Sequence, residues 1–113
     1  MTLYKILRAA EWEALRAAGR TAGAPVDLAD GYVHLSAAAQ VRATAAKHFA
    51  GEEGLVLLAV DAAALGDALR WEPARGGEDF PHLYAELPLS AVARAEPLPL
   101  RDDGSHAFPD GIP

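Results

Sequence analysis

Hydrophobic and polar positions change their spacing several times along the chain, and each change marks the boundary of an expected element. Residues 2–7 alternate strand-forming side chains, which predicts a strand buried on at least one face. Residues 9–18 are alanine-rich and place Trp12 and Leu15 on one side of a helix. Gly19 follows at the position where glycine commonly ends a helix. The chain is therefore expected to begin with a strand and a short amphipathic helix.

A loop and a second strand–helix pair are expected next. Residues 21–31 mix glycine, proline and aspartate, which is typical of turns and extended loop. Residues 32–35 predict a brief strand, and a helix is expected over residues 36–49. Ser36 is the candidate N-cap, because its hydroxyl can accept a hydrogen bond from a free amide of the first turn. The inner face of this helix repeats at every fourth position, at Val41, Ala45 and Phe49.

The second half of the chain predicts mostly strands. Residues 54–60 form a continuous apolar run of strand length, so this strand is expected to be central and covered on both faces. Residues 73–79 are read as a glycine-bearing loop. Further strands are expected at residues 69–72, 82–87 and 91–98.

This order of elements predicts an α+β fold, with a small, twisted, mixed or antiparallel sheet and two main helices packed on it. Strand and helix do not alternate steadily, and no glycine-rich phosphate loop of the dinucleotide-binding or nucleoside triphosphatase type is present. Residues 1–100 are expected to form a single α+β domain. Residues 101–113 hold three aspartates, two glycines and two prolines, which predicts an irregular C-terminal tail.

Composition narrows the classes of function. The 113 residues include no cysteine, which excludes disulfides, thiolate metal sites and cysteine nucleophiles. Ten basic against sixteen acidic side chains give a formal net charge of -6, which argues against stable binding to nucleic acid or to an anionic membrane. No apolar run reaches the length of a membrane span, and the N-terminus lacks a secretory signal, so a cytoplasmic location is expected.

Two histidines carry the candidate chemistry. His34 and His82 each lie in a short apolar, strand-like run, and each is followed two positions later by a hydroxyl, from Ser36 and Tyr84 respectively. If the two strands are neighbours, both imidazoles can meet on one face of a sheet and converge on one ligand. Each of these side chains also has a structural interpretation, as a buried histidine with a satisfied hydrogen bond or as a core aromatic.

The residues that carry the candidate chemistry also resemble a known family. The chain is similar, over about residues 3–96, to the bacterial family named domain of unknown function 952. This resemblance implies a split sheet with a fold like that of the ADP-ribosyltransferases, which cleave NAD in a cleft between two small sheets. It rests on a set of short motifs: Tyr4-Lys5-Ile6, Glu11-Trp12, Asp30-Gly31-Tyr32-Val33-His34-Leu35-Ser36, Gln40-Val41, Thr44-Ala45, His48-Phe49, Leu57-Leu58-Ala59-Val60-Asp61, Leu69-Arg70-Trp71-Glu72 and Phe80-Pro81-His82-Leu83-Tyr84.

The resemblance assigns roles to particular residues. It implies that His34 hydrogen-bonds a ribose hydroxyl and that Ser36 supplies a small hydroxyl beside a helix N-terminus, where backbone amides favour an anionic group such as pyrophosphate. His82 or Tyr84 is the implied late-strand group that helps to hold the nicotinamide.

The acidic residue that polarises the ribose in that superfamily has two candidates here, Glu72 and Glu78. A late-strand motif with a fixed glutamate is not readable, which supports ligand binding more than transfer of ADP-ribose. The expected catalytic set is His34, His82 and Glu78. The expected binding set is His34, Ser36, Trp71, Arg75 and Tyr84, in which Arg75 lies in the glycine loop and can be brought to a phosphate.

Three functions stay open at this point. The first is binding of NAD or a related nucleotide or phosphate ligand, with NAD as a substrate rather than a required cofactor and with turnover left open. The second is a two-histidine phosphoesterase-like hydrolase, because His34-Leu35-Ser36 fits the His-x-Ser/Thr element of such enzymes. The third is a non-catalytic binding or interaction module. No metal site is expected, since no close-spaced ligand pair such as His-x-x-x-His occurs.

Overall fold

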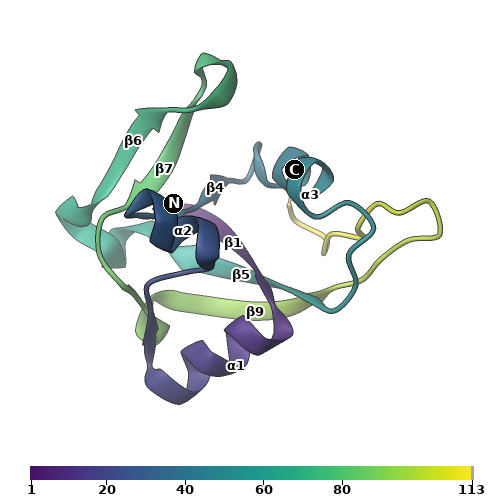
Figure 1. Cartoon of the computed structure of the whole chain (residues 1–113), viewed down its shortest axis with the longest axis horizontal. Helices are drawn as coiled ribbons and strands as arrows, with labels where there is room; N and C mark the ends of the chain where they lie inside the picture. The colour runs from purple at the N-terminus through teal and green to yellow at the C-terminus, as the bar shows by residue number, and fades with distance from the viewer. Residues whose placement is uncertain (113) are drawn as a thin grey trace.

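A four-stranded antiparallel sheet organises the fold (Figure 1). The computed structural model describes residues 1–112, without the side chain of Arg75. The sheet has the order β4-β1-β5-β9 and consists of β1 (Thr2–Arg8), β4 (Ser36–Ala37), β5 (Leu55–Asp61) and β9 (Val92–Leu98). Strand β5 lies between β1 and β9, and its side chains belong alternately to two hydrophobic clusters. The predicted central strand covered on both faces is therefore confirmed.

The two main helices lie on opposite faces of this sheet. Helix α1 (Ala9–Ala18) buries Leu15 among the β1 side chains Leu3 and Leu7, and it ends at Gly19, whose φ of 80° is in the left-handed region. Helix α3 (Val41–His48) buries Val41 and Ala45 against the other side of the sheet. Both helices and the α+β class agree with the pattern of the sequence.

A second, separate sheet has three antiparallel strands. Its order is β3-β7-β6, from β3 (Val33–His34), β6 (Leu69–Pro73) and β7 (Asp79–Leu83). Figure 1 shows the β6–β7 hairpin extending away from the main sheet, with α2 (Pro25–Asp30) near its base. A short pair, β2 (Arg20–Thr21) with β8 (Leu87–Pro88), and the 3-10 helices η1 (Ala62–Ala68), η2 (Arg75–Gly77) and η3 (Leu89–Ala91) complete the elements.

Three predicted segments differ from the structure. Residues 21–31 contain α2 instead of loop alone, because Pro25 opens the helix and the Asp27 carboxylate accepts a hydrogen bond from the amide of Ala24 at 2.7 Å. The predicted strand over residues 82–87 is divided, since β7 ends at Leu83 and β8 begins at Leu87.

The third difference concerns Ser36. Ser36 belongs to β4 and pairs with Tyr4 of β1, while the helix starts only at Val41. The side chain of Gln40 bridges the turn between them, because its Oε1 accepts from the amide of Ala37 at 2.9 Å and its Nε2 donates to the Asp79 carbonyl at 2.8 Å. The prediction of Ser36 as a helix N-cap is therefore wrong, and no anion-binding helix terminus lies there.

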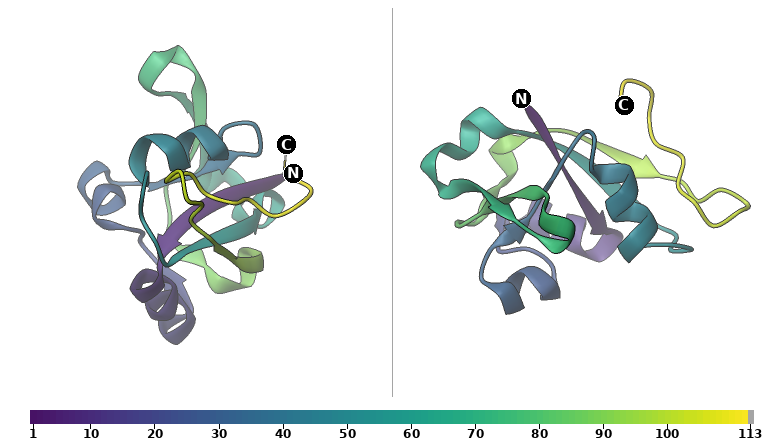
Figure 2. Two further views of the ribbon diagram at one scale, coloured as in Figure 1. Left: turned by 90° about the vertical axis from the view of Figure 1, so that its right-hand side faces the viewer. Right: turned by 90° about the horizontal axis from the view of Figure 1, so that it is seen from above.

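Residues 101–112 contain no helix or strand, and they pack on the main sheet. Ile112 is buried and Phe108 partly buried in the cluster that contains Val41 and Ile6, and the right view of Figure 2 shows this yellow segment continuing from the end of β9. His106 is buried too, with Nε2 2.8 Å from the carbonyl oxygen of Glu52. Among the described residues, no helix has the length and apolar character needed to cross a membrane.

Candidate functional site

The two candidate histidines lie side by side on one face of the β3-β7-β6 sheet. His34 and His82 are register partners on the antiparallel strands β3 and β7, and their ring centroids are 5.6 Å apart in an edge-to-face arrangement. The ring of Tyr32 packs against both, with centroids 4.6 Å from His34 and 4.1 Å from His82. Tyr84 lies two residues after His82 and therefore on the same face, and its ring centroid is 5.2 Å from that of Tyr32.

His82 is held by an acidic partner from the neighbouring strand. Its Nδ1 lies 2.8 Å from Glu72 Oε1, and the hydroxyl of Tyr84 donates to the same oxygen at 2.7 Å. The hydrogen bonds from Tyr84 and His82 lower the pKa of Glu72, and the bond to Glu72 raises the pKa of Tyr84. The carboxylate therefore fixes both the orientation of the imidazole and the nitrogen that faces the protein.

The other ring nitrogen of His82, Nε2, has no hydrogen-bond partner within the described part of the chain. The side chain is only 5% exposed, yet no fully buried side-chain nitrogen or oxygen among those residues lacks a partner. Nε2 is therefore accessible to solvent, and His82 lines a large cavity. A buried imidazole with Nδ1 anchored and Nε2 turned to a cavity can give or take a proton, or bind a ligand oxygen.

His34 contacts two carboxylates. Its Nδ1 lies 2.5 Å from Asp27 Oδ1, and its Nε2 lies 3.0 Å from Asp30 Oδ2. The side chain is one-third exposed (33%), so it is more open than that of His82. The contact with Asp27 is a hydrogen bond, whereas Asp30 is a close acidic neighbour of Nε2.

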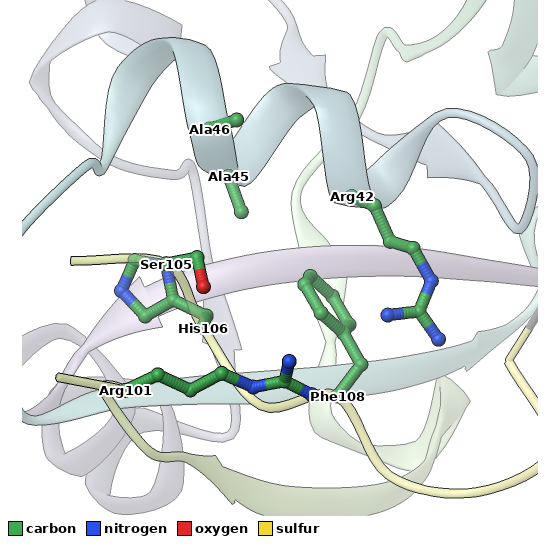
Figure 3. A pocket seen from close by; sticks show the side chains of 7 residues that line it. All are labelled: Arg42, Ala45, Ala46, Arg101, Ser105, His106 and Phe108. Atoms are coloured by element: carbon green, nitrogen blue, oxygen red, sulfur yellow. The ribbon is translucent and has the colours of Figure 1, made fainter. Parts of the chain in front are cut away.

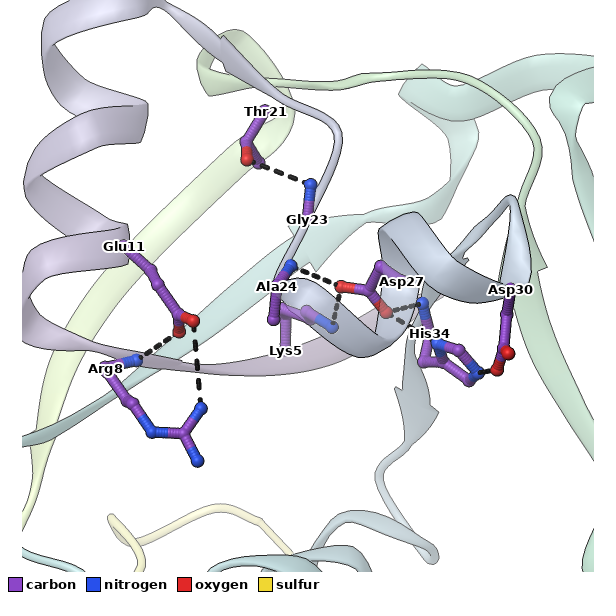
Figure 4. A network of polar contacts seen from close by, with 9 residues as sticks. All are labelled: Lys5, Arg8, Glu11, Thr21, Gly23, Ala24, Asp27, Asp30 and His34. Carbon is purple, nitrogen blue, oxygen red and sulfur yellow. Dashed lines mark hydrogen bonds and ion pairs between the residues drawn. The ribbon is translucent and has the colours of Figure 1, made fainter.

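The carboxylate of Asp27 connects α2 to β1 and β3 (Figure 4). Its side chain is fully buried, and it accepts hydrogen bonds from Lys5 Nζ at 2.8 Å, from the amide of Ala24, and from the amide of His34 at 2.9 Å. Burial by itself raises the pKa of such a group, but the His34 hydrogen bond and the Lys5 charge outweigh it and lower the pKa of Asp27 to about 2. Asp27 is thus ionised and fixes both Lys5 and His34.

Gly23 makes room for this carboxylate. A Cβ at Gly23 would lie 2.2 Å from Asp27 Oδ2, and the φ of 105° is in the region that side chains rarely adopt. Only glycine therefore fits beside the buried Asp27.

The histidines form part of the wall of a cavity of about 1100 Å³. Small-molecule sites usually have volumes of roughly 300–1000 Å³, so this cleft has room for a dinucleotide. Cations and anions both line it, among them Lys47 and Arg8 on one hand and Asp30 and Glu78 on the other. Strands β1, β3 and β7, helices α2 and α3, and the loop between β6 and β7 all contribute to the wall.

The structure places the other expected site residues differently. Ser36 lines the cavity but is buried, with Oγ 3.0 Å from Thr44 Oγ1. Glu78 is exposed and lines the cavity, whereas Glu72, its alternative, contacts His82 and Tyr84. Tyr84 reaches the site through Glu72 and is not itself part of the wall.

Trp71 does not lie with the other members of the expected binding set. It pairs with Pro81, while its neighbour Arg70 pairs with His82. Because side chains alternate across a strand, Trp71 points to the face of the sheet opposite His82 and does not line the cavity. The side chain of Arg75 lies outside the described part of the structure, so its predicted contact with a phosphate stays a prediction.

Sequence reasoning missed the roles of Lys5 and Asp27. Lys5 is a cation in an otherwise apolar strand, between Tyr4 and Ile6, and a buried cation needs an acidic partner. Asp27 lies between Val26 and Leu28, in the segment whose composition predicted turns and loop. The apolar neighbours of both charged residues were the only sign in the sequence that they are buried. Their pairing across 22 positions depends on the tertiary structure.

A smaller cavity of about 240 Å³ lies between α3 and the C-terminal segment (Figure 3). Arg42 packs over the ring of Phe108 at 4.8 Å and donates to the carbonyl of Ile112 at 2.7 Å. These contacts attach the C-terminal segment to α3. Among the described residues, no group of three or more histidine, aspartate or glutamate side chains is arranged to hold a metal ion.

The fold and the large cavity define a small α+β domain with a pair of carboxylate-anchored histidines on one wall of a cleft. The chain belongs to the family described as "Protein of unknown function (DUF952)", whose model matches residues 6–95. The expected family membership is therefore confirmed. None of the curated proteins matches this chain.

Solved structures of one protein are closely similar. The crystal structure of protein CC0527 from Caulobacter crescentus is 52% identical, covers 99% of this chain and 98% of its own, and superposes with a TM-score of 0.94. The solution NMR structure of CC0527 is 55% identical over 92% of this chain and 90% of its own, with a TM-score of 0.83. The family name assigns no activity, so functional reasoning depends on the geometry of the site.

Proposed function

We propose that the cleft binds NAD or a related nucleotide that carries phosphate, and that His34 and His82 contact this ligand. One observation carries the proposal: both imidazoles have Nδ1 held by a carboxylate, and they lie together on the wall of a cavity of about 1100 Å³. A histidine whose role is only to stabilise the core has no need to line an open cavity with its second ring nitrogen. The resemblance to ADP-ribosyltransferase-like domains supports the choice of ligand.

Within this proposal, His34 binds a ribose hydroxyl and His82 lies next to the nicotinamide side. The ring of Tyr32, which packs against both histidines, offers an aromatic surface to a planar base. Lys47 of α3 is an exposed cation on the wall of the same cavity, and it is suited to attract the phosphates.

Transfer of ADP-ribose is the activity that this ligand implies. In such a step the bond between the nicotinamide nitrogen and ribose C1′ breaks, nicotinamide leaves, and an acceptor that loses a proton takes its place on C1′. An acidic side chain near the ribose stabilises the cationic transition state. Glu78 lines the cavity, whereas Glu72 already accepts hydrogen bonds from His82 and Tyr84. We assign the stabilising role to Glu78.

Calorimetric titration and thermal unfolding with NAD and ADP-ribose test the proposal. A ligand that binds only the folded state stabilises it by about 2.7 kcal/mol at a hundredfold excess over its Kd, which raises the Tm of a domain of this size by roughly 10 °C or more. His34→Asn and His82→Asn are suitable variants, because the asparagine amide can replace Nδ1 toward the carboxylate but lacks Nε2.

Both variants should bind at least about tenfold more weakly, since each loses a hydrogen bond to an ionic or polar ligand group. Asp67→Asn, an exposed position in η1 that does not line the cavity, is the control and should bind like the unchanged protein. The proposal fails if neither nucleotide shifts the Tm or gives a binding isotherm.

A two-histidine phosphoesterase-like hydrolase is the second candidate, and the anchored Nδ1 atoms favour it too. Two imidazoles with ring centroids 5.6 Å apart can approach one cyclic phosphate, where one removes a proton from water and the other protonates the leaving oxygen. Hydrolysis of a 2′,3′-cyclic nucleotide, lost in both asparagine variants, would assign this activity instead of NAD binding.

A further inference from the structure

Asp30 occupies the ring nitrogen of His34 that a ligand would use. Its Oδ2 lies 3.0 Å from Nε2 of His34, and the side chain lines the large cavity while remaining 45% exposed. Asp30 is the last residue of α2, directly before Gly31, whose φ of 87° ends the helix. By contrast, Nε2 of His82 has no partner in the described part of the chain.

Orientation of the imidazole does not require Asp30. Asp27 is fully buried, contacts Nδ1 of His34 at 2.5 Å and accepts from its backbone amide at 2.9 Å. These two contacts already fix the position of the ring. The contact with Asp30 adds only an exposed acceptor at the surface of the cavity, and exposed ion pairs contribute little to stability.

We infer that Asp30 competes with the ligand. The carboxylate of Asp30 occupies the position that an anionic oxygen of the ligand would take at Nε2 of His34. This inference rests on the proposed function and revises one contact in it: at Nε2 of His34 the ligand presents a phosphate or another anionic oxygen instead of the ribose hydroxyl. The ligand must displace Asp30, and the negative charge of the displaced side chain then opposes an anion nearby. Asp30 thereby lowers the affinity for such an anionic ligand.

The variant Asp30→Asn tests this inference by calorimetric titration with ADP-ribose and with inorganic pyrophosphate. The expected result is binding about fivefold tighter than in the unchanged protein, which corresponds to roughly 1 kcal/mol. The control Asp67→Asn removes the same charge at a place remote from the cavity wall and should change the affinity by less than about twofold.

A double variant separates competition at Nε2 from the general effect of a charge. The His34→Asn variant lacks Nε2. In that background, Asp30→Asn should improve the binding free energy by less than about half of the improvement that it gives when His34 is present. If the gain is equal in both backgrounds, or if Asp30→Asn binds no tighter than the unchanged protein, the inference is overturned while the proposed function stands. If no variant binds either probe, the proposed function and the inference both fail.

Discussion

Replacement of Asp27 by asparagine should destabilise the protein more than any other isosteric change of a charged side chain in the described structure. Asp27 accepts hydrogen bonds from Lys5 Nζ, from the amide of Ala24, and from both the amide and the ring of His34. An asparagine of the same shape turns an N–H group toward one pair of these donors. The ammonium of Lys5, whose side chain is 8% exposed, then loses its counter-ion.

Two independent arguments give the magnitude. Loss of one partner from a buried ion pair costs about 3–5 kcal/mol, because the other charge stays buried and uncompensated. The pKa of Asp27, about 2 instead of 3.8, corresponds to roughly 2 kcal/mol of preference for the ionised form in the folded state. We therefore expect Asp27→Asn to lower the free energy of unfolding by about 3 kcal/mol at neutral pH.

Urea unfolding followed by circular dichroism measures this change, with Asp67→Asn as the control for loss of an exposed carboxylate. The pKa of Asp27 is lowered by folding, so its contribution is fully present above the unfolded value and is lost as the pH falls through 3.8 toward 2. Between about pH 5 and about pH 2, the unchanged protein should therefore lose roughly 2 kcal/mol of unfolding free energy that the variant does not lose. A loss below about 1 kcal/mol at neutral pH, with an unchanged m value, would refute the reasoning.

Three further changes test other contacts of the fold. Gly23→Ala should cost at least about 2 kcal/mol in urea unfolding, because the new Cβ would overlap a buried carboxylate and φ is 105°; a cost near zero would mean that the loop moves freely. Tyr84→Phe should raise the pKa of Glu72 toward its ordinary value in an NMR titration, since the Tyr84 hydrogen bond is the largest cause of its lowering; an unmoved pKa would contradict the contact. Leu58→Ala should cost about 2–5 kcal/mol in the core, and Leu28→Ala, at an exposed position, less than about 0.5 kcal/mol; equal costs would contradict the assigned burial.

Local sequence was sufficient for two elements. Strand β5 and helix α1 were predicted within one residue at each end, because β5 is a continuous apolar run of strand length and α1 has one apolar face and a glycine at its end. Helix α2 was missed because its six residues are too few to show a period, and because contacts of Asp27 with distant residues support it. Ser36 was misplaced for a similar reason: its strand exists only through pairing with Tyr4 of β1.

The candidate site shows the same division. His34 and His82 could be singled out from their unusual place in apolar runs, and both line the cavity. Trp71 and Glu72 are adjacent, and nothing local indicates which of them lies on the same face as His82. The register of β6 against β7 decides it, because this register puts Glu72 on the face of His82 and Trp71 on the other.

The sequence by itself determined the α+β class, the central apolar strand, the family and the pair of histidines, since these follow from spacing and residue type within short windows. Only the tertiary structure decided that the histidines are cross-strand neighbours, that Asp27 and Glu72 hold their Nδ1 atoms, and that Asp30 covers one Nε2. The physical reason is that strand pairing and ion pairing join residues far apart in the chain. Their partners are selected by burial of the whole core, which no short window contains.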